Sequence, residues 1–231
     1  EALQREIGRT ARFEDDFEFD PSLVGTTSGP LVAGVDQAFL TGEEPERAVS
    51  AVVVLRGEAV VERVHAVTPL SIPYVPGLLS FREGESILAA LRELETDPDL
   101  LLFDGSGRIH FREAGLATHV GVLVDRPSVG VAKSLLCGES REPAEGLPEG
   151  TRVPIETDGR METEPGTVVG YAYQSRQYPD SKRINPLYVS PGHRVSAETA
   201  VDLVERCGGD YKLPEPTRLA DAHADEVKRE L

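Results

Sequence analysis

Three apolar segments rich in β-branched residues follow one another between residues 31 and 67, and they constrain the fold more than any other feature. The segments are LVAGVDQAFL (31–40), AVSAVVVL (48–55) and AVVERVHAV (59–67). Their length and composition predict strands, and the short turn at residues 56–58 predicts an antiparallel meander. Within the first segment a single acidic residue, Asp36, interrupts the apolar run.

The following part of the chain alternates between helical and strand patterns. Residues 82–96 and 115–125 predict helices, and residues 99–105 and 127–134 predict buried strands. A strand, a helix and a second strand in this order predict a parallel βαβ unit. A meander followed by such units is the order of a ribonuclease-H-like α/β fold, so we expect a mixed sheet flanked by helices. The length suits a single domain spanning residues 1–231.

Further elements are expected toward both ends of the chain. The first residues, EALQREIGRT, indicate the start of an amphipathic helix and not a signal peptide. Residues 68–81 contain three prolines and predict mostly loop. The remaining patterns predict a short strand near 151–156, a strand at 167–175 and a short strand or extended segment at 185–192. A helix is expected from Ser196 to about Cys207, and a terminal helix at 216–231.

The net charge of −16 is unusual for any protein that binds a polyanion. Asp and Glu total 40 against 24 Lys and Arg, and only four of these cations are lysines. Phosphate repels an acidic protein at low salt. Either the chain does not bind nucleic acid, or it works in concentrated salt, where this repulsion is screened within a few ångströms. The second explanation predicts a halophilic source.

Two observations bear on the compartment. No run of about 18 apolar residues occurs, so no membrane span is expected. The two cysteines, Cys137 and Cys207, are far apart and lack metal-ligand spacing, which favours free thiols in a reducing cytoplasm. A disulfide between them stays open at this point.

Three carboxylates occupy positions that suit catalytic or metal-binding residues. Asp36 lies inside an apolar strand, where an unpaired carboxylate is costly to bury. Asp104 ends a buried strand, the position at which α/β sheets place ligand sites. Glu83 begins a helix. Each has an ordinary alternative: a hydrogen-bonded strand residue, a turn residue before Gly105, and a helix-dipole residue, respectively. Together they can converge on one Mg²⁺, which prefers carboxylates, water and phosphate oxygens.

Several long segments resemble the successive blocks of the endonuclease V family. They are VAGVDQAF (32–39), PYVPGLLSFRE (73–83), LLFDGSGRIHFREAGLATHVGVLVDRPSVGVAKSLLCG (101–138), NPLYVSPGHRVS (185–196) and YKLPEPTRLAD (211–221). They occur in the family's order and cover nearly all of residues 31–221. The resemblance implies a ribonuclease-H-like fold and a Mg²⁺-dependent endonuclease, with Mn²⁺ as a substitute. It also implies a nick at the second phosphodiester bond 3′ of deoxyinosine in damaged DNA.

The resemblance also implies roles for individual residues. Asp36 and Asp104 match the family's principal metal ligands, and Glu83 matches its third active-site carboxylate. Asp221 matches a further acidic position, with a solvated helix charge as the alternative. Lys133 and His193 match an active-site lysine and histidine, and both are expected to assist catalysis.

A second group of matching residues is implied to bind the DNA. Tyr74 matches a wedge residue, and a proline-braced aromatic side chain suits entry into the base stack. Gly77, Leu79 and Arg82 would border the base pocket. His110 and His119 match histidines of the DNA-contacting region. Two departures in the DNA-facing loop, Phe111 and Ser106, leave the contacts there open.

Two alternatives to a DNA nuclease remain. The same core would serve an endoribonuclease acting on inosine in RNA, for which contacts to the 2′-hydroxyl would be diagnostic. A non-catalytic nucleic-acid-binding protein is also compatible with the fold, although the intact carboxylate set argues against it. The blocks favour a metal-dependent enzyme and the halophilic explanation of the acidic charge. We expect a monomer.

Overall fold

The computed structural model describes residues 2–42, 45–70, 79–178 and 184–231, and it describes residues 79–82 without their side chains. The expected meander is confirmed. Strands β1 (Val32–Leu40), β2 (Arg47–Arg56) and β3 (Ala59–Pro69) pair antiparallel in sequence order. The register places Asp36 of β1 opposite Ala51 of β2.

The expected βαβ unit is also confirmed. Strand β4 (Leu100–Asp104) pairs parallel to β1, and β5 (Ser128–Ala132) pairs parallel to β4 across helix α3 (Leu116–Val124). Helix α2 (Leu79–Arg92) connects β3 to β4 and ends four residues before the expected boundary. Its end is tightened by i→i−3 hydrogen bonds from the backbone amides of Glu93 and Leu94, a common way for a helix to terminate.

Within the described residues the sheet extends beyond this unit and comprises nine strands in the order β3-β2-β1-β4-β5-β9-β8-β7-β6. The added strands are β9 (Leu187–His193), β8 (Val168–Tyr173), β7 (Arg152–Glu156) and β6 (Glu139–Ser140). Strand β9 runs antiparallel to β5, and the strands beyond it continue antiparallel. The three predicted strands of this region are therefore confirmed, and their direction determines where His193 lies.

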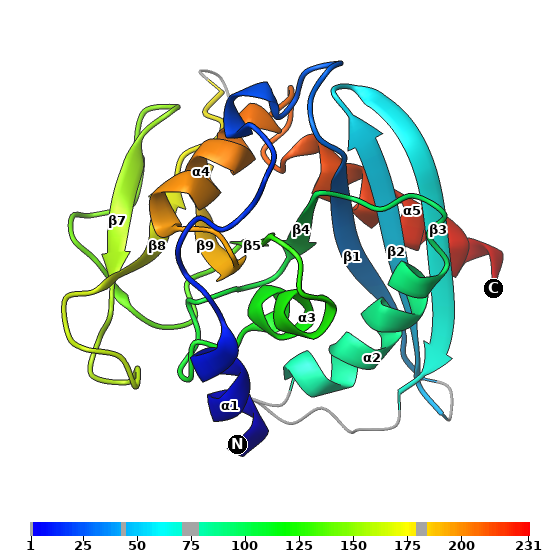
Figure 1. Cartoon of the computed structure of the whole chain (residues 1–231), viewed down its shortest axis with the longest axis horizontal. Coiled ribbons are helices and arrows are strands. Elements are labelled where there is room, and N and C mark those ends of the chain that lie inside the picture. The colour runs from blue at the N-terminus through cyan, green and yellow to red at the C-terminus, as the bar shows by residue number, and fades with distance from the viewer. Residues whose placement is uncertain (1, 43–44, 71–78, 179–183) are drawn as a thin grey trace.

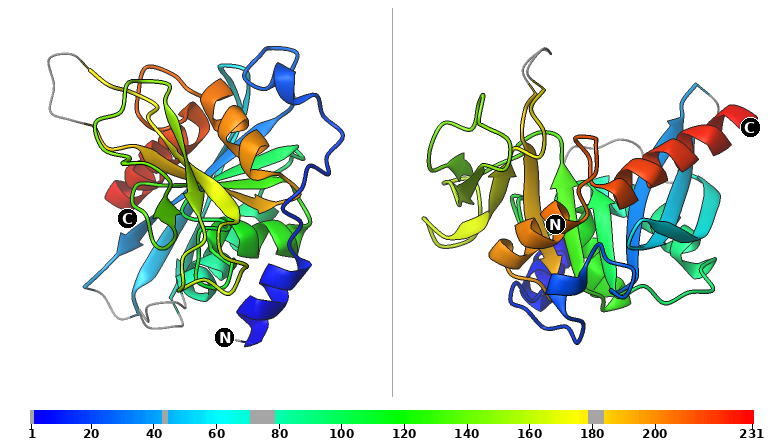
Figure 2. Two further views of the ribbon diagram at one scale, coloured as in Figure 1. Left: turned by 90° about the vertical axis from the view of Figure 1, so that its left-hand side faces the viewer. Right: turned by 90° about the horizontal axis from the view of Figure 1, so that it is seen from above.

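Helices cover both faces of the sheet. Helices α2 and α3 lie in front of the sheet in Figure 1, and α5 (Glu215–Glu230) lies behind β1 and β2. Helix α4 (Ala197–Arg206) packs on β8 and β9. Helix α1 (Ala2–Thr10) contacts α3, and a short 3-10 helix, η1 (Pro21–Leu23), follows it. The right-hand view of Figure 2 shows α5, in red, as a long helix beside β1 and β2.

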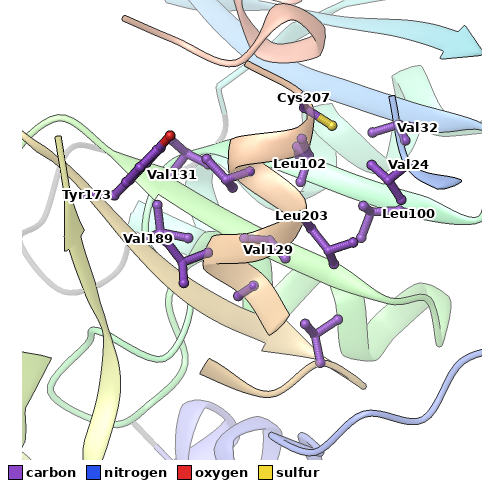
Figure 3. Close-up of a cluster of buried hydrophobic side chains, with 14 of the residues drawn as sticks. Val24, Val32, Leu100, Leu102, Val129, Val131, Tyr173, Val189, Leu203 and Cys207 are labelled. Carbon is purple, nitrogen blue, oxygen red and sulfur yellow. The ribbon is translucent and has the colours of Figure 1, made fainter. Parts of the chain in front are cut away.

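Strand β4 is buried on both faces, which explains its uninterrupted apolar sequence. Leu100 and Leu102 pack under α4 with Val129 and Val131 (Figure 3), whereas Leu101 and Phe103 pack under α2 and α3. Because the side chains alternate, Asp104 points to the same face as Leu100 and Leu102. Helix α5 covers that face over β1 and β2.

The two cysteines were expected to be free thiols, and the structure agrees. Cys137 and Cys207 are both buried. Burial raises the pKa of each thiol to about 12, so neither is a reactive thiolate near neutral pH.

Among the helices that the structure describes, none combines the length and apolarity that crossing a bilayer requires.

Candidate active site

Two strand carboxylates lie side by side at the centre of the sheet. Val35 of β1 pairs with Phe103 of β4, so Asp36 and Asp104 follow at the same level of two parallel neighbouring strands. The period of two places both side chains on the face that α5 covers. The side chain of Asp104 is 14% exposed, which leaves one edge of the pair accessible.

Helix α5 adds a third carboxylate from the other end of the chain. Gly34 of β1 lies against the backbone of Pro216, so closely that a Cβ atom at Gly34 would meet the Pro216 carbonyl at 2.0 Å. From this contact, five residues of helix and two residues of strand each advance about 7 Å. Asp221 is thereby brought to the level of Asp36.

The three carboxylates form one cluster. One oxygen atom from each of Asp36, Asp104 and Asp221 lies within 4.8 Å of the other two. Burial, the negative charge of Asp104 and then the contacts with Asp221 raise the pKa of Asp36 to about 8. Such an arrangement is unfavourable when all three groups are ionised, and a hard divalent cation would relieve it. The donor set therefore fits a metal that prefers oxygen ligands.

Lys133 provides the positive charge beside this cluster. Its Nζ donates to Asp104 Oδ2 at 2.6 Å, directly after the last residue of β5. Burial lowers the pKa of Lys133, but the hydrogen bond to Asp104 and the charges of Asp104, Asp36 and Asp221 raise it overall. The side chain is 52% exposed, so its ammonium group is held at the surface of the site.

A pocket of about 480 Å³ opens over the cluster. Glu83, the fifth residue of α2, lines it and is 8% exposed. The side-chain amide of Gln37 lies 3.3 Å from the backbone carbonyl of Glu83 and donates to it. The pocket is bordered by the three clustered carboxylates and by further polar, apolar and backbone positions, namely Val35, Phe39, Ile87, Gly105, Ser106, His110, Phe111, Gly115, Leu116, Lys133 and Leu136.

His110 lines this pocket as a neutral imidazole. Burial, followed by the charge of Arg112, lowers the pKa of His110 to about 4. The Arg112 backbone amide donates to Nδ1 at 3.2 Å, so the ring proton of the neutral form is on Nε2. His110 therefore offers one hydrogen-bond donor, Nε2–H, and carries no positive charge near neutral pH.

The arrangement has counterparts among known proteins. The family model described as Endonuclease V matches residues 20–222. Curated proteins named endonuclease V share 67% identity in Natronomonas pharaonis, over 99% of this chain and 90% of that protein, and 56% in Haloarcula marismortui, over 99% and 91%. The chain belongs to the endonuclease V family. Both relatives come from halophilic archaea, in agreement with the expectation from the acidic charge.

Solved structures of endonuclease V share the fold. The catalytic domain of human endonuclease V superposes with a TM-score of 0.83 at 34% identity, covering 99% of this chain and 94% of that chain. The Ciona intestinalis endonuclease V, in complex with DNA containing an inosine followed by a ribo-adenosine, gives 0.79 at 28% identity, covering 99% and 96%. The chain is a nuclease with the expected ribonuclease-H-like fold.

One residue expected at the endonuclease V site lies elsewhere. His193 pairs with Ser128, the first residue of β5, whereas Lys133 follows the last. Five residues of strand separate the two ends, about 16 Å. The His193 imidazole accepts from the Arg12 backbone amide at 3.2 Å and contacts Asp125 at 3.1 Å. These contacts join the N-terminal segment to the sheet, and His193 does not line the pocket that holds the carboxylates, so its catalytic role stays a prediction.

The other residues expected to bind DNA either lie outside the described part of the structure, are described by their backbone only, or lie away from the pocket. Tyr74 and Gly77 lie outside the described residues. Leu79 and Arg82 lie in the first turn of α2, where only the backbone is described. His119 is 5% exposed on α3 and lies under Gly84 of α2, outside the lining of the pocket.

The sequence reasoning missed some pocket residues. Gln37 lines the pocket and contacts α2, and Leu136 supplies an apolar border. Gln37 could have been found from its position, because a polar residue next to Asp36 in an apolar strand needs a partner on the opposite face. Leu136 carries no such signal. Phe111 and Ser106, noted as departures from the family, both line the pocket.

Proposed function

We propose that this endonuclease V hydrolyses the second phosphodiester bond 3′ of deoxyinosine in DNA, as a step in the repair of deaminated bases. The observation that carries the proposal is the cluster of Asp36, Asp104 and Asp221 in one pocket with Glu83 and Lys133. Support for the base comes from the Ciona intestinalis family member, which was solved with inosine-containing DNA.

Asp36, Asp104 and Asp221 would hold the metal, and Mg²⁺ suits an all-carboxylate set that leaves room for water and phosphate oxygens. Mn²⁺ can substitute for it. When bound, the cation supplies positive charge at the phosphate and lowers the pKa of nearby water. The raised pKa of Asp36 means that the apoprotein releases a proton as the carboxylates are loaded near neutral pH.

The protein groups around the cluster complete the reaction. Glu83, buried in the pocket wall, orients the attacking water and accepts its proton. The water oxygen bonds to phosphorus while the bond from phosphorus to the 3′-oxygen breaks. The departing oxygen takes up a proton, which gives 3′-hydroxyl and 5′-phosphate ends. Lys133 stabilises the additional negative charge on the phosphate oxygens as they crowd around phosphorus.

Base recognition would use the same pocket. His110 presents an Nε2–H donor that can bind a carbonyl oxygen of an extruded hypoxanthine, and Phe111 offers an aromatic wall. In this proposal Tyr74 would enter the stack where the base has left it, and Gly77, Leu79 and Arg82 would border the base pocket. We further propose that the chain acts as a monomer and as one domain.

RNA is the second candidate substrate. The DNA bound to the Ciona intestinalis protein carries a ribo-adenosine directly after the inosine, so that family member accommodates a 2′-hydroxyl beside the lesion. Cleavage at phosphate makes little use of the sugar, and the carboxylate cluster serves either strand.

The test compares inosine-containing DNA and RNA strands, with and without Mg²⁺, at low and molar salt, and maps the nick. We expect metal-dependent cleavage at the second bond 3′ of inosine. Asp36→Ala and Asp104→Ala should abolish nicking and leave strand binding measurable. Cleavage by Asp104→Ala at the wild-type rate would contradict the proposed chemistry. Strand binding that never leads to a nick under any metal condition would favour a non-catalytic binding protein.

A further inference from the structure

Lys212 lies in a loop that is fixed to the sheet immediately before α5. Three residues that follow β8 donate to backbone carbonyl groups of this loop. Arg176 donates to Gly209, the Tyr178 hydroxyl donates to Asp210 at 2.7 Å, and Ser175 Oγ donates to the carbonyl of Lys212 at 2.6 Å. The backbone of Lys212 is therefore anchored at the position that the end of β8 sets.

The register of the sheet places this anchor at the edge that carries the active site. Lys133 follows Ala132 of β5, and Ala132 pairs with Tyr188 of β9. The neighbouring Leu187 pairs with Tyr173, the last residue of β8, and Ser175 follows two residues later. Neighbouring strands lie about 4.8 Å apart, so Ser175 and Lys212 lie about two strand spacings from Lys133 at the same edge.

The charges around Lys212 distinguish it from the arginines nearby. Arg152, Arg176 and Arg218 each form an ion pair with a Glu or Asp side chain. Within the described residues, no carboxylate lies at ion-pair distance from Lys212. The like charge of Lys133 acts on Lys212. Burial lowers the pKa of the half-buried Lys212, and Lys133 lowers it further.

Two ammonium groups held near each other without a shared carboxylate are unfavourable, and an anion between or beside them removes the cost. In a chain with 40 acidic residues and four lysines, carboxylates are abundant, yet none occupies this position among the described residues. We propose that Lys212 binds a phosphodiester group of the substrate strand next to the one that is cut, so that Lys133 and Lys212 contact successive phosphates.

This inference rests on the proposed function. It adds a contact to the phosphate backbone of the substrate strand, and this contact fixes the position of the strand over the carboxylates. A phosphate contact positions the strand without reading its sequence. It also offers a local attraction on a chain whose net charge of −16 repels nucleic acid overall. The contact should therefore matter equally for inosine-containing and inosine-free strands.

The experiment measures binding of fluorescent single strands to the full-length protein in EDTA, over a series of KCl concentrations. Lys212→Ala is compared with the wild type, with Lys212→Arg and with Lys228→Ala. Lys228 is exposed in the last turn of α5, beyond the pocket, and controls for the loss of one charge. Circular dichroism spectra verify that each variant is folded. A second set of strands carries one neutral methylphosphonate at each linkage in turn.

We expect Lys212→Ala to bind about tenfold more weakly at the lowest salt, as for a lost hydrogen bond to a charged group. The slope of log affinity against log salt should become shallower by about 0.7. Lys212→Arg and Lys228→Ala should bind like the wild type. One methylphosphonate should weaken the wild type and have no further effect on Lys212→Ala.

An unchanged salt slope in Lys212→Ala, or a methylphosphonate effect that is the same in both proteins at every linkage, would overturn the inference. The same slope change on strands with and without inosine supports the phosphate contact. If the wild type showed no preference for inosine in that experiment, the proposed function would fail while the role of Lys212 stood.

Discussion

The hydroxyl groups of Ser50 on β2 and Ser86 on α2 lie 2.6 Å apart, and both side chains are almost completely buried. Gln37 of β1 donates to Ser50 Oγ at 2.6 Å and also to the backbone carbonyl of Glu83. This cluster joins the strand that carries Asp36 to the helix turn that carries Glu83. The side chains of Gln37 and Ser50 project to the opposite face of the sheet from the carboxylate of Asp36. They therefore hold the helix that carries Glu83 against the strand that carries Asp36.

Removing the central hydroxyl should loosen this connection. We expect Ser50→Ala to lower the free energy of unfolding by about 1–3 kcal/mol, because the partly buried Gln37 amide and the buried Ser86 hydroxyl lose their shared partner. The single-turnover nicking rate should also fall, with strand affinity retained. Denaturant unfolding and rapid-quench assays measure the two effects. Ser28→Ala, at an exposed position, is the matched control, and equal stability of the two variants would contradict this role.

The raised pKa of Asp36 predicts how the stability of the metal-free protein depends on pH. The folded state favours protonated Asp36, so its contribution to stability is full below the ordinary pKa of 3.8 and is lost as pH rises to about 8. In this interval the free energy of unfolding should decrease by up to about 1.4 kcal/mol per pH unit through this group.

Asp36→Asn is the control for this pH effect, because an amide of similar shape does not titrate. The wild-type curve should fall relative to the variant curve as pH rises, and saturating Mg²⁺ should remove most of the difference. Chemical unfolding in EDTA at a series of pH values provides the measurement. Parallel curves for the two proteins would show that folding leaves the pKa of Asp36 near its ordinary value of 3.8.

The position of His193 separates a structural role from a catalytic one. Because its imidazole contacts Arg12 and Asp125 at the far end of β5, His193→Gln should nick within about threefold of the wild type. Its free energy of unfolding should drop by about 1–2 kcal/mol. Lys133→Ala should retain stability and lose at least about a hundredfold in rate, as for other charge-stabilising groups. Single-turnover rates below the melting range test both, and a hundredfold loss in His193→Gln would support a catalytic role for this residue.

The contrast between β1–β5 and β6–β9 shows how far sequence patterns determine this fold. The strands at 31–40, 48–55 and 59–67 were predictable because apolar alternation and short connections are local properties. The antiparallel direction of β9 was not, because it depends on pairing with β5 after a long intervening segment. A histidine at the end of an unoriented strand can lie at either edge of the sheet, and the structure places His193 beside Ser128, at the opposite end of β5 from Lys133.

The site residues also divide into those that a local sequence pattern identifies and those that it does not. Asp36 and Asp104 were identifiable because a carboxylate in or after a buried strand is costly without a purpose. Asp221 lies in a helix with several other charges, where only the family resemblance distinguished it from a solvated residue. Its place in the cluster depends on a long-range contact between Gly34 and Pro216, which no local pattern encodes.

That contact gives the last prediction. A Cβ atom at Gly34 would lie 2.0 Å from the Pro216 carbonyl carbon and oxygen and 2.6 Å from the Thr217 amide. These are backbone atoms of a helix start, so they cannot turn aside, and Gly34→Ala must push α5 away from β1. We expect a loss of about 1–3 kcal/mol in the free energy of unfolding, as for an overpacked core.

The same displacement should draw Asp221 away from Asp36, so metal affinity should fall together with stability. Isothermal titration with Mn²⁺ and the single-turnover nicking rate measure this at a temperature where the variant is folded, and both should drop about tenfold, the loss of one charged ligand contact. Gly159→Ala is the control, because no atom lies within 4 Å of the added methyl group. Wild-type Mn²⁺ affinity in a destabilised Gly34→Ala would mean that Asp221 reaches the cluster independently of this packing, and the close approach would then serve the fold alone.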